Sequence, residues 1–338
     1  MHTSRTALVI GGNGGIGREA CLALQRHGWQ VRALVRHVPA ACDGIEWIRG
    51  DAMQRDDVLA AAAGTAVIVH AVNPPGYRNW DTLVLPMLDN TIAAAKANGA
   101  RVVLPGTIYN YGPDAFPLLR EDSPQHPPTR KGEIRAEMEQ RLAAASRAGV
   151  RALILRCGDF FGPHAGNNWF GQGLVRPGKP VKTLRYPADY AHHHAWAYLP
   201  DVAETIAQLL EHELADFDAY HFGGYWLDAY AMADAVRRAT HHPHIALRRF
   251  PWWLTALAAP FTETLRELRK MRYLWKTPVR LDDAKLAALL GSRPYTPLDE
   301  ALRATLAGLG CIEVQGQLRE VLPGEKRDQP KAYATAQQ

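Results

Sequence analysis

An α/β fold built on a doubly wound parallel sheet is the architecture that the 338-residue sequence predicts. An apolar stretch at residues 7–10 leads directly into glycines at positions 11, 14 and 17, and a helical stretch from Arg18 to His27 follows at once. Strand and helix signals then alternate up to Cys157, which is typical of parallel strands covered by helices on both faces. Beyond Cys157 the chain becomes rich in Gly, Pro, aromatic residues and His, which indicates a smaller second lobe.

The elements follow one another as such a fold requires. We expect strands at residues 7–10, 30–35, 45–49, 66–70, 101–104 and 151–156, and a short strand at 220–222 that returns to the same sheet. Helices are expected at residues 80–98, 130–148 and 200–213. These elements predict a Rossmann-type domain, 1–157 plus 200–223, a smaller, mostly helical C-terminal substrate lobe, 158–199 plus 224–322, and a flexible polar tail, 323–338.

The glycine-rich turn has the spacing of a dinucleotide-binding βαβ unit. Gly11 permits a tight turn, Gly14 lets the backbone approach a pyrophosphate, and Gly17 allows the helix to pack closely on the strand. The first amides of the helix then face the phosphates. The residues expected to bind cofactor in this turn are Gly11, Asn13, Gly14, Gly15, Ile16 and Gly17.

The residues that follow the second strand favour NADP over NAD. An NAD site has an acidic residue about 20 positions after the last glycine, where it binds the ribose hydroxyls. No carboxylate occurs between Glu19 and Asp43; Val35 occupies the expected position, and Arg36 follows it. Because a guanidinium suits a 2′-phosphate, we expect NADP, with NAD as the alternative and a purely solvated Arg36 as the other interpretation.

Composition excludes several other classes of protein. The net charge is +5, but Lys and Arg are spread along the chain without a basic run, so no nucleic-acid partner is expected. The longest apolar stretch, 58–72, is shorter than the roughly 18 residues of a membrane-spanning helix. The four cysteines have no CxxC spacing and the N-terminus does not resemble a signal peptide, so we expect reduced thiols and a cytoplasmic location.

Further motifs appear in a fixed order after the glycine turn. They are Gly50-Asp51, His70-Ala71, Asn90, Thr107 with Tyr111-Gly112, Leu155-Arg156 with Gly162-Pro163, and the run from Leu199 to Ala203. Together they resemble the extended short-chain dehydrogenase/reductases, which include sugar-nucleotide epimerases and dehydratases, over residues 5–310. The resemblance implies that Asp51, Ala52, His70 and Ala71 also lie at the cofactor, with Asp51 near the adenine amine. It also implies a homodimer formed through the helices at 80–98 and 130–148.

For catalysis, the resemblance implies a Ser or Thr after the fifth strand, an Asn in the helix at 80–98, and a Tyr-x-x-x-Lys pair in the helix at 130–148. Thr107 and Asn90 match. The pair does not, because the matching positions are occupied by Lys131 and Arg135. No other register restores it, since none of the 12 tyrosines has a lysine four residues later.

Two residues are therefore candidates to move the proton that accompanies hydride transfer. Lys131 would have a lowered pKa if it were buried beside Arg135 and a cationic nicotinamide, although both residues could instead belong to a solvated basic face. Tyr109 lies near Thr107 at the carboxyl end of a strand, where ligands gather in such sheets, although it could point to solvent. Tyr111 is expected to pack in the interior.

Two classes of function remain open. One is an NAD(P)-dependent oxidoreductase acting on a carbonyl or hydroxyl carbon of a small, apolar substrate, or a sugar-nucleotide epimerase or dehydratase in which Arg176, Lys179, Lys182 and Arg185 bind a diphosphate. The other is a non-catalytic NADP(H)-binding sensor. The aromatic and basic segment 248–275 is interpreted as a lid over the substrate, with contact to a membrane surface as the alternative. The run from His192 to His194 is not expected to bind metal.

Overall fold

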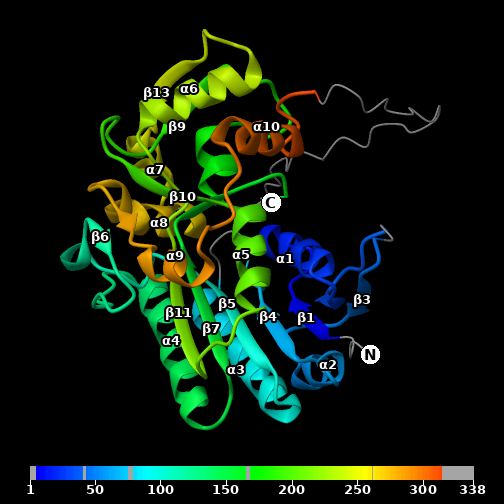
Figure 1. The fold of residues 1–338 in the computed structure, drawn as a ribbon. Coiled ribbons are helices and arrows are strands. Elements are labelled where there is room, and N and C mark those ends of the chain that lie inside the picture. The colour runs from blue at the N-terminus through cyan, green and yellow to red at the C-terminus, as the bar shows by residue number, and fades with distance from the viewer. Residues whose placement is uncertain (1–4, 41–42, 75–78, 165–167, 261, 314–338) are drawn as a thin grey trace, which may run out of the picture.

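A seven-stranded parallel sheet forms the centre of the protein. The computed structural model describes residues 5–40, 43–74, 79–164, 168–260 and 262–313 (Figure 1). The strands are β1 (Thr6–Ile10), β2 (Gln30–Val35), β3 (Glu46–Arg49), β4 (Val67–His70), β5 (Arg101–Thr107), β7 (Ala152–Cys157) and β11 (Phe217–Phe222). Their order in the sheet is β11-β7-β5-β4-β1-β2-β3, and all pairings are parallel. The predicted doubly wound fold is thus confirmed.

The strand order changes direction at β1. It first adds β2 and β3 on one side of β1 and then returns to place β4 and β5 on the other side. In open α/β sheets, ligands bind beyond the carboxyl ends of the strands at such a switch point. The fold therefore places the glycine turn after β1 and the strand ends of β4, β5 and β7 along one edge.

Helices cover both faces of the sheet. On one face lie α1 (Gly15–Arg26) and α5 (Leu199–Leu209), which pack against Ala7 and Val9 of β1. On the other face, α2 (Arg55–Ala61), α3 (Trp80–Asn98) and α4 (Arg130–Arg147) join the cluster that contains Leu8 and Ile10. Alternate residues of one strand thus enter two separate cores, which explains why the strand is apolar along its whole length.

The remaining residues form smaller sheets and helices above the carboxyl edge. β8 (Asp159–Phe161), β10 (His194–Tyr198) and β12 (Tyr225–Leu227) form one small sheet, and β9 (Thr183–Tyr186) pairs with β13 (Ala246–Arg249). The loop-rich character expected for 158–199 is thus interrupted by three short strands. The other elements are β6 (Leu118–Leu119), α6 (Ala229–Thr240), α7 (Trp252–Ala258), α8 (Glu263–Lys270), β14 (Arg280–Leu281), α9 (Ala284–Leu290), α10 (Leu298–Gly308), and short helical turns at Pro113–Ala115, Phe170–Leu174 and Met271–Trp275.

Several element ends differ from the prediction: α1 and β11 each begin three residues early, and the ends of β5 and α5 differ by three and four residues. β5 continues to Thr107, three residues past the expected end, because beyond Val103 it pairs with β7 but no longer with β4. Pro105, which lacks an N–H, is tolerated where the ladder has a single neighbour. α5 ends at Leu209, before the expected Glu213. The predicted tail, 323–338, lies outside the described residues. In the part of the chain that is described, no helix has the length and apolar character needed to cross a bilayer.

The glycine turn is closed by a close approach between α1 and β1. A Cβ on Gly17 would lie 2.2 Å from the carbonyl oxygen of Gly11, which is far below any real contact. Gly11 itself has a φ of +87°, a conformation that L side chains rarely adopt. Both glycines are therefore required by the backbone geometry.

Substitution of Gly17 tests this packing. In Gly17→Ala the methyl group forces α1 away from β1, and we expect the free energy of unfolding to fall by about 1–3 kcal/mol, as for other overpacked sites. Urea unfolding measures this loss. Gly14→Ala is the matched comparison: its Cβ would lie 3.3 Å from the same oxygen, so its stability should change less. Equal stability of Gly17→Ala and the parent protein would contradict the packing argument.

Candidate functional site

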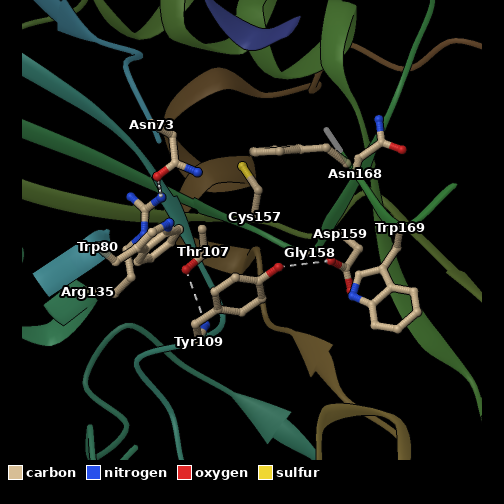
Figure 2. Close-up of a pocket in the computed structure, with 11 residues that line it drawn as sticks. Asn73, Trp80, Thr107, Tyr109, Arg135, Cys157, Gly158, Asp159, Asn168 and Trp169 are labelled. Carbon is tan, nitrogen blue, oxygen red and sulfur yellow. Dashed lines mark hydrogen bonds between the residues drawn. The ribbon is translucent and has the colours of Figure 1, made fainter. Parts of the chain in front are cut away.

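A pocket lies beyond the carboxyl ends of β5 and β7, beside the start of α3 and α4 (Figure 2). Burial raises the pKa of Cys157 in its wall, so this residue is a neutral thiol. Cys21 and Cys311 are free as well. The pocket is lined by Asn73, Trp80, Thr107, Tyr109, Arg135, Cys157, Gly158, Asp159, Phe160, Asn168 and Trp169.

The glycine turn provides a backbone surface suited to a pyrophosphate. α1 begins at Gly15, and in the described structure neither a side-chain cap nor an acidic residue in the first turn competes for its N-terminal amides. A Cβ on Gly11 would meet the carbonyl oxygen of Ala71 at 3.0 Å, so the segment after β4 lies directly against the turn. Ile16 and Gly17 follow within the first turn of α1. These features fit a bound dinucleotide.

The segments after β2 and β3 border the same turn. Arg36 is exposed just past the end of β2. The side-chain amide of Asn13 donates to the carbonyl oxygen of His37 at 2.6 Å and so links the glycine turn to this segment. Asp51 accepts a hydrogen bond from the amide of Met53 at 2.9 Å, and its own amide donates to the carboxylate of Asp57 at 2.8 Å. Asp51 therefore shapes the turn after β3.

Asn90 is placed differently from what the resemblance implies. Its side-chain amide donates to the carbonyl oxygens of Ala52 and Met53, at 2.9 and 3.1 Å. It is not among the residues that line the pocket. Asn90 thus ties α3 to the turn after β3 and supports that side of the site.

His70, the last residue of β4, has a ring nitrogen, Nε2, without a hydrogen-bond donor among the described residues. Its Nδ1 lies 2.8 Å from the hydroxyl of Thr91, which donates to the carbonyl of Met87, so Nδ1 must be the protonated nitrogen. Burial, and then the charge of Arg135, lower the pKa of His70 to about 3, so the ring is neutral. Nε2 is buried without a hydrogen-bond partner among the described residues, a vacancy that a donor on a bound dinucleotide would satisfy.

Thr107 and Tyr109 face the pocket together. The hydroxyl oxygen of Thr107 accepts a hydrogen bond from the amide of Tyr109 at 3.2 Å. The Tyr109 side chain is buried and does not point to solvent, and its hydroxyl lies 3.4 Å from Oδ1 of Asp159. In Figure 2 the Tyr109 ring lies across the pocket, between Thr107 and Asp159.

Lys131 has surroundings that the sequence did not predict. Its Nζ is buried and lies 2.7 Å from Oε2 of Glu267 on α8, and it does not line the pocket. Burial alone would raise the pKa of Glu267, but hydrogen bonds from Lys131 and Lys270 lower it, so the carboxylate is charged. Lys131 therefore faces a countercharge, which neither of the two interpretations of the sequence included.

Arg135, one turn later on α4, does reach the pocket. Its Nη2 donates to Oδ1 of Asn73 at 3.4 Å, and its guanidinium lies over the ring of Trp80, 5.0 Å from the centroid. Figure 2 shows this side chain at the end of the pocket opposite Asp159. The basic face of α4 is therefore only partly solvated: Arg130 is exposed, Lys131 is buried, and Arg135 is half-buried at the pocket.

Asp159, which binds the hydroxyl of Tyr109, also forms a buried pair with His194. Nε2 of His194 lies 2.7 Å from Oδ2 of Asp159, and both side chains are almost fully buried. The parallel pairing of β8 with β10 brings them together, and the His194 ring stacks on Trp275 with centroids 3.8 Å apart. Sequence reasoning considered a metal site at His194, did not expect one, gave the residue no other role, and overlooked Asp159. In the described residues no group of three or more His, Cys, Asp or Glu side chains could hold a metal ion.

Tyr111 packs in the interior, as its position predicts. Burial raises its pKa, and its hydroxyl lies 2.7 Å from Arg156 and 2.9 Å from His221. Arg156 in turn forms an ion pair of 2.7 Å with Glu139 of α4. This network joins β7, β11, α4 and the segment after β5, and it holds the floor of the site.

The glycine turn after β1 and the pocket beyond β5 and β7 define a dinucleotide-binding protein of the Rossmann class. Residues 7–223 match the model of the NAD-dependent epimerase/dehydratase family. The chain therefore belongs to this family, and a nicotinamide dinucleotide is its cofactor class.

Two curated relatives are similar to the chain over part of its length. The 3-diazoavenalumate denitrifying reductase of a Streptomyces species is 32% identical over 177 residues, which cover 47% of this chain and 57% of that protein. The 2-alkyl-3-oxoalkanoate reductase of Stenotrophomonas maltophilia (strain K279a) is 31% identical over 173 residues, 46% of this chain and 51% of that protein. The matched segment thus spans little more than half of each relative.

Solved structures share the fold over most of the chain. UDP-glucose 4-epimerase from Bifidobacterium longum, in complex with NAD+ and UDP, superposes with a TM-score of 0.70 at 17% identity and covers 90% of this chain and 97% of its own. L-threonine dehydrogenase from Clostridium difficile gives a TM-score of 0.71 at 16% identity, covering 91% and 99%. At these identities the likeness establishes the fold.

The exposed position of Arg36 predicts the coenzyme preference. If Arg36 binds the 2′-phosphate of NADP, Arg36→Ala removes that charged partner, and we expect the Kd for NADPH to rise at least about tenfold, with little change in the Kd for NADH. Fluorescence titration with each coenzyme measures both constants. Arg147→Ala, an equal change of charge near the far end of α4, is the control and should leave both unchanged. Parallel losses for the two coenzymes in Arg36→Ala would contradict a 2′-phosphate contact.

Proposed function

We propose that the protein is an NADP(H)-dependent oxidoreductase that acts at a carbonyl or hydroxyl carbon of a small, apolar substrate. The observation that carries this proposal is the Tyr109 side chain in the pocket, whose hydroxyl donates to Asp159 and whose backbone amide donates to Thr107. A phenol at this point supplies the proton chemistry that the missing Tyr-x-x-x-Lys pair would otherwise provide. Lys131 does not take this part, because it is bound to Glu267 and lies outside the pocket.

Tyr109 and Asp159 carry out the proposed proton transfer in two linked steps. In the oxidising direction, the oxygen of Tyr109 accepts the proton of the substrate hydroxyl while the phenolic proton passes to Oδ1 of Asp159. In the reducing direction both transfers run backwards, and Asp159 replaces the proton that Tyr109 gives to the carbonyl oxygen. His194 binds Oδ2 and so keeps Oδ1 toward Tyr109. The hydroxyl of Thr107 donates to the substrate oxygen, and a bound nicotinamide supplies or accepts the hydride.

The walls of the pocket favour an apolar substrate. Trp80, Phe160 and Trp169 present aromatic surface, and Arg135 is the cation among the described lining residues. The two curated relatives are named as reductases, one of them of 2-alkyl-3-oxoalkanoates, which supports carbonyl reduction here.

Binding of a sugar nucleotide is less well supported by the geometry. The cations considered for a diphosphate do not line the described pocket, and Arg176, Lys179 and Lys182 are exposed on the surface of the smaller lobe. A diphosphate in the pocket would therefore meet mainly aromatic side chains and Arg135. We accordingly place epimerisation behind simple oxidation or reduction.

Removal of the phenol tests the proposal directly. Hydride transfer from NADPH to a panel of aldehydes, ketones, β-keto acids and sugar nucleotides identifies a substrate, and Tyr109→Phe should then lower kcat by about 10²–10⁴-fold. The Kd for NADPH should stay unchanged. Tyr230→Phe, at an exposed tyrosine, is the control. Full activity of Tyr109→Phe would remove Tyr109 from the mechanism, and saturable NADPH binding without turnover on the panel would favour a sensor.

Asp159 acts through Tyr109 and is a positioning residue in this scheme. Asp159→Asn keeps the shape of the side chain but removes the proton acceptor, so we expect kcat to fall by at least about tenfold and its dependence on pH to flatten. Steady-state rates measured across a pH series test both expectations. An unchanged pH profile in Asp159→Asn would show that the carboxylate takes no part in the proton transfer.

A further inference from the structure

Helix α7 exposes a compact apolar face. Trp253, Leu254 and Leu257 are 66%, 47% and 67% exposed, and their spacing places them on one side of the helix. The opposite side is fixed, because Thr255 is buried and the indole nitrogen of Trp252 donates to the carbonyl oxygen of Pro187 at 2.8 Å. The apolar side is therefore held outward by packing.

Exposed cations lie on the elements that flank α7, and of these Arg249 is paired with Asp189 at 2.6 Å. In Figure 1, α8 lies next to α7 on the same side of the molecule. The guanidinium of Arg272 lies over the ring of Trp252, 5.3 Å from its centroid. Glu267 is the acidic residue of segment 248–276 whose side chain the structure describes. It is buried and forms ion pairs with Lys131 and Lys270. The exposed cations of this segment are Arg248, Arg249, Arg266, Arg269, Lys270, Arg272 and Lys276.

Aromatic contacts lead from α7 to the pocket. Trp252 contacts Trp169 with ring centroids 5.7 Å apart, and Trp169 lines the pocket. Trp169 also contacts Trp275 at 5.2 Å. These rings pack the inner side of α7 against the wall of the pocket.

We propose that α7 and the cations around it dock the protein on an anionic lipid surface. Large apolar side chains ringed by Lys and Arg are the features by which interfacial helices bind: the apolar groups enter the acyl boundary and the cations meet anionic headgroups. A second copy of this chain would bring the same cations against one another, so lipid fits the charge better than self-association. Delivery of an apolar substrate from the bilayer rests on the proposed function, whereas the docking itself does not.

Vesicle binding tests the docking. The full chain should co-sediment with vesicles of phosphatidylcholine containing about one third phosphatidylglycerol, and far less with pure phosphatidylcholine. Raising the salt concentration should weaken the binding because the headgroup attraction is screened. In Trp253→Ser/Leu257→Ser the apparent affinity should fall at least about tenfold. In Arg266→Gln/Arg269→Gln it should fall by about fivefold per charge.

Controls separate docking from misfolding and from catalysis. Tyr230→Ser/Tyr295→Ser removes two other exposed aromatic side chains, 55% and 57% exposed, and should bind vesicles like the parent. NADPH titration of Trp253→Ser/Leu257→Ser should match the parent, which shows that its fold is intact. Failure of Tyr109 to act in catalysis would leave the vesicle results unchanged.

Three outcomes overturn the proposal. They are no binding of the parent to anionic vesicles, equal binding by Trp253→Ser/Leu257→Ser, or a parent dimer that light scattering shows becoming monomeric in that variant. The last outcome would assign the α7 face to a contact between two copies of the chain.

Discussion

The close approach of α1 to β1 is the constraint on which the site depends. With Gly17 against the carbonyl of Gly11, the N-terminus of α1 lies directly above the end of β1, and the segment after β4 closes on the same turn. Those amides therefore lie on the carboxyl edge of the sheet, the same edge at which β5 and β7 end. Thr107, Tyr109 and Arg135 line one pocket on the same edge as the glycine turn because that edge is fixed.

In the proposed mechanism the acid–base group at this edge is Tyr109, from the segment after β5, and not a residue of α4. The helix that would carry the tyrosine carries Lys131, which is joined to α8, while a phenol from the segment after β5 enters the pocket. The carboxylate and imidazole behind that phenol come from β8 and β10, two short strands of the smaller lobe. The site is thus assembled from both parts of the chain, and its chemistry depends on how the second part packs on the first.

The parts of this arrangement that could be read from the sequence are the local ones. The glycine turn, the positions of the strands along the chain and the extent of α3 follow from spacing and periodicity within a few residues. The pairing of Asp159 with His194 depends on two strands 35 residues apart, and the pairing of Lys131 with Glu267 on two helices 136 residues apart. No local pattern encodes such contacts.

Asn90 shows a further limit of motif reasoning. Its residue type and position match the resemblance, yet its amide is used by the backbone carbonyls of Ala52 and Met53. A motif identifies a residue but does not determine which neighbouring group that residue binds. His194 illustrates the converse, since it stood out as a possible metal ligand and instead binds a carboxylate.

The buried ion pair between Lys131 and Glu267 also constrains how this chain can change. A single replacement of Lys131 by Tyr would bring back half of the missing motif, but it would take from Glu267 the more deeply buried of its two cations. The incoming ring would also meet α8, where the ammonium now sits. Introducing a tyrosine at this position therefore requires coordinated substitutions in α4 and α8, because either change alone leaves a buried charge without its partner.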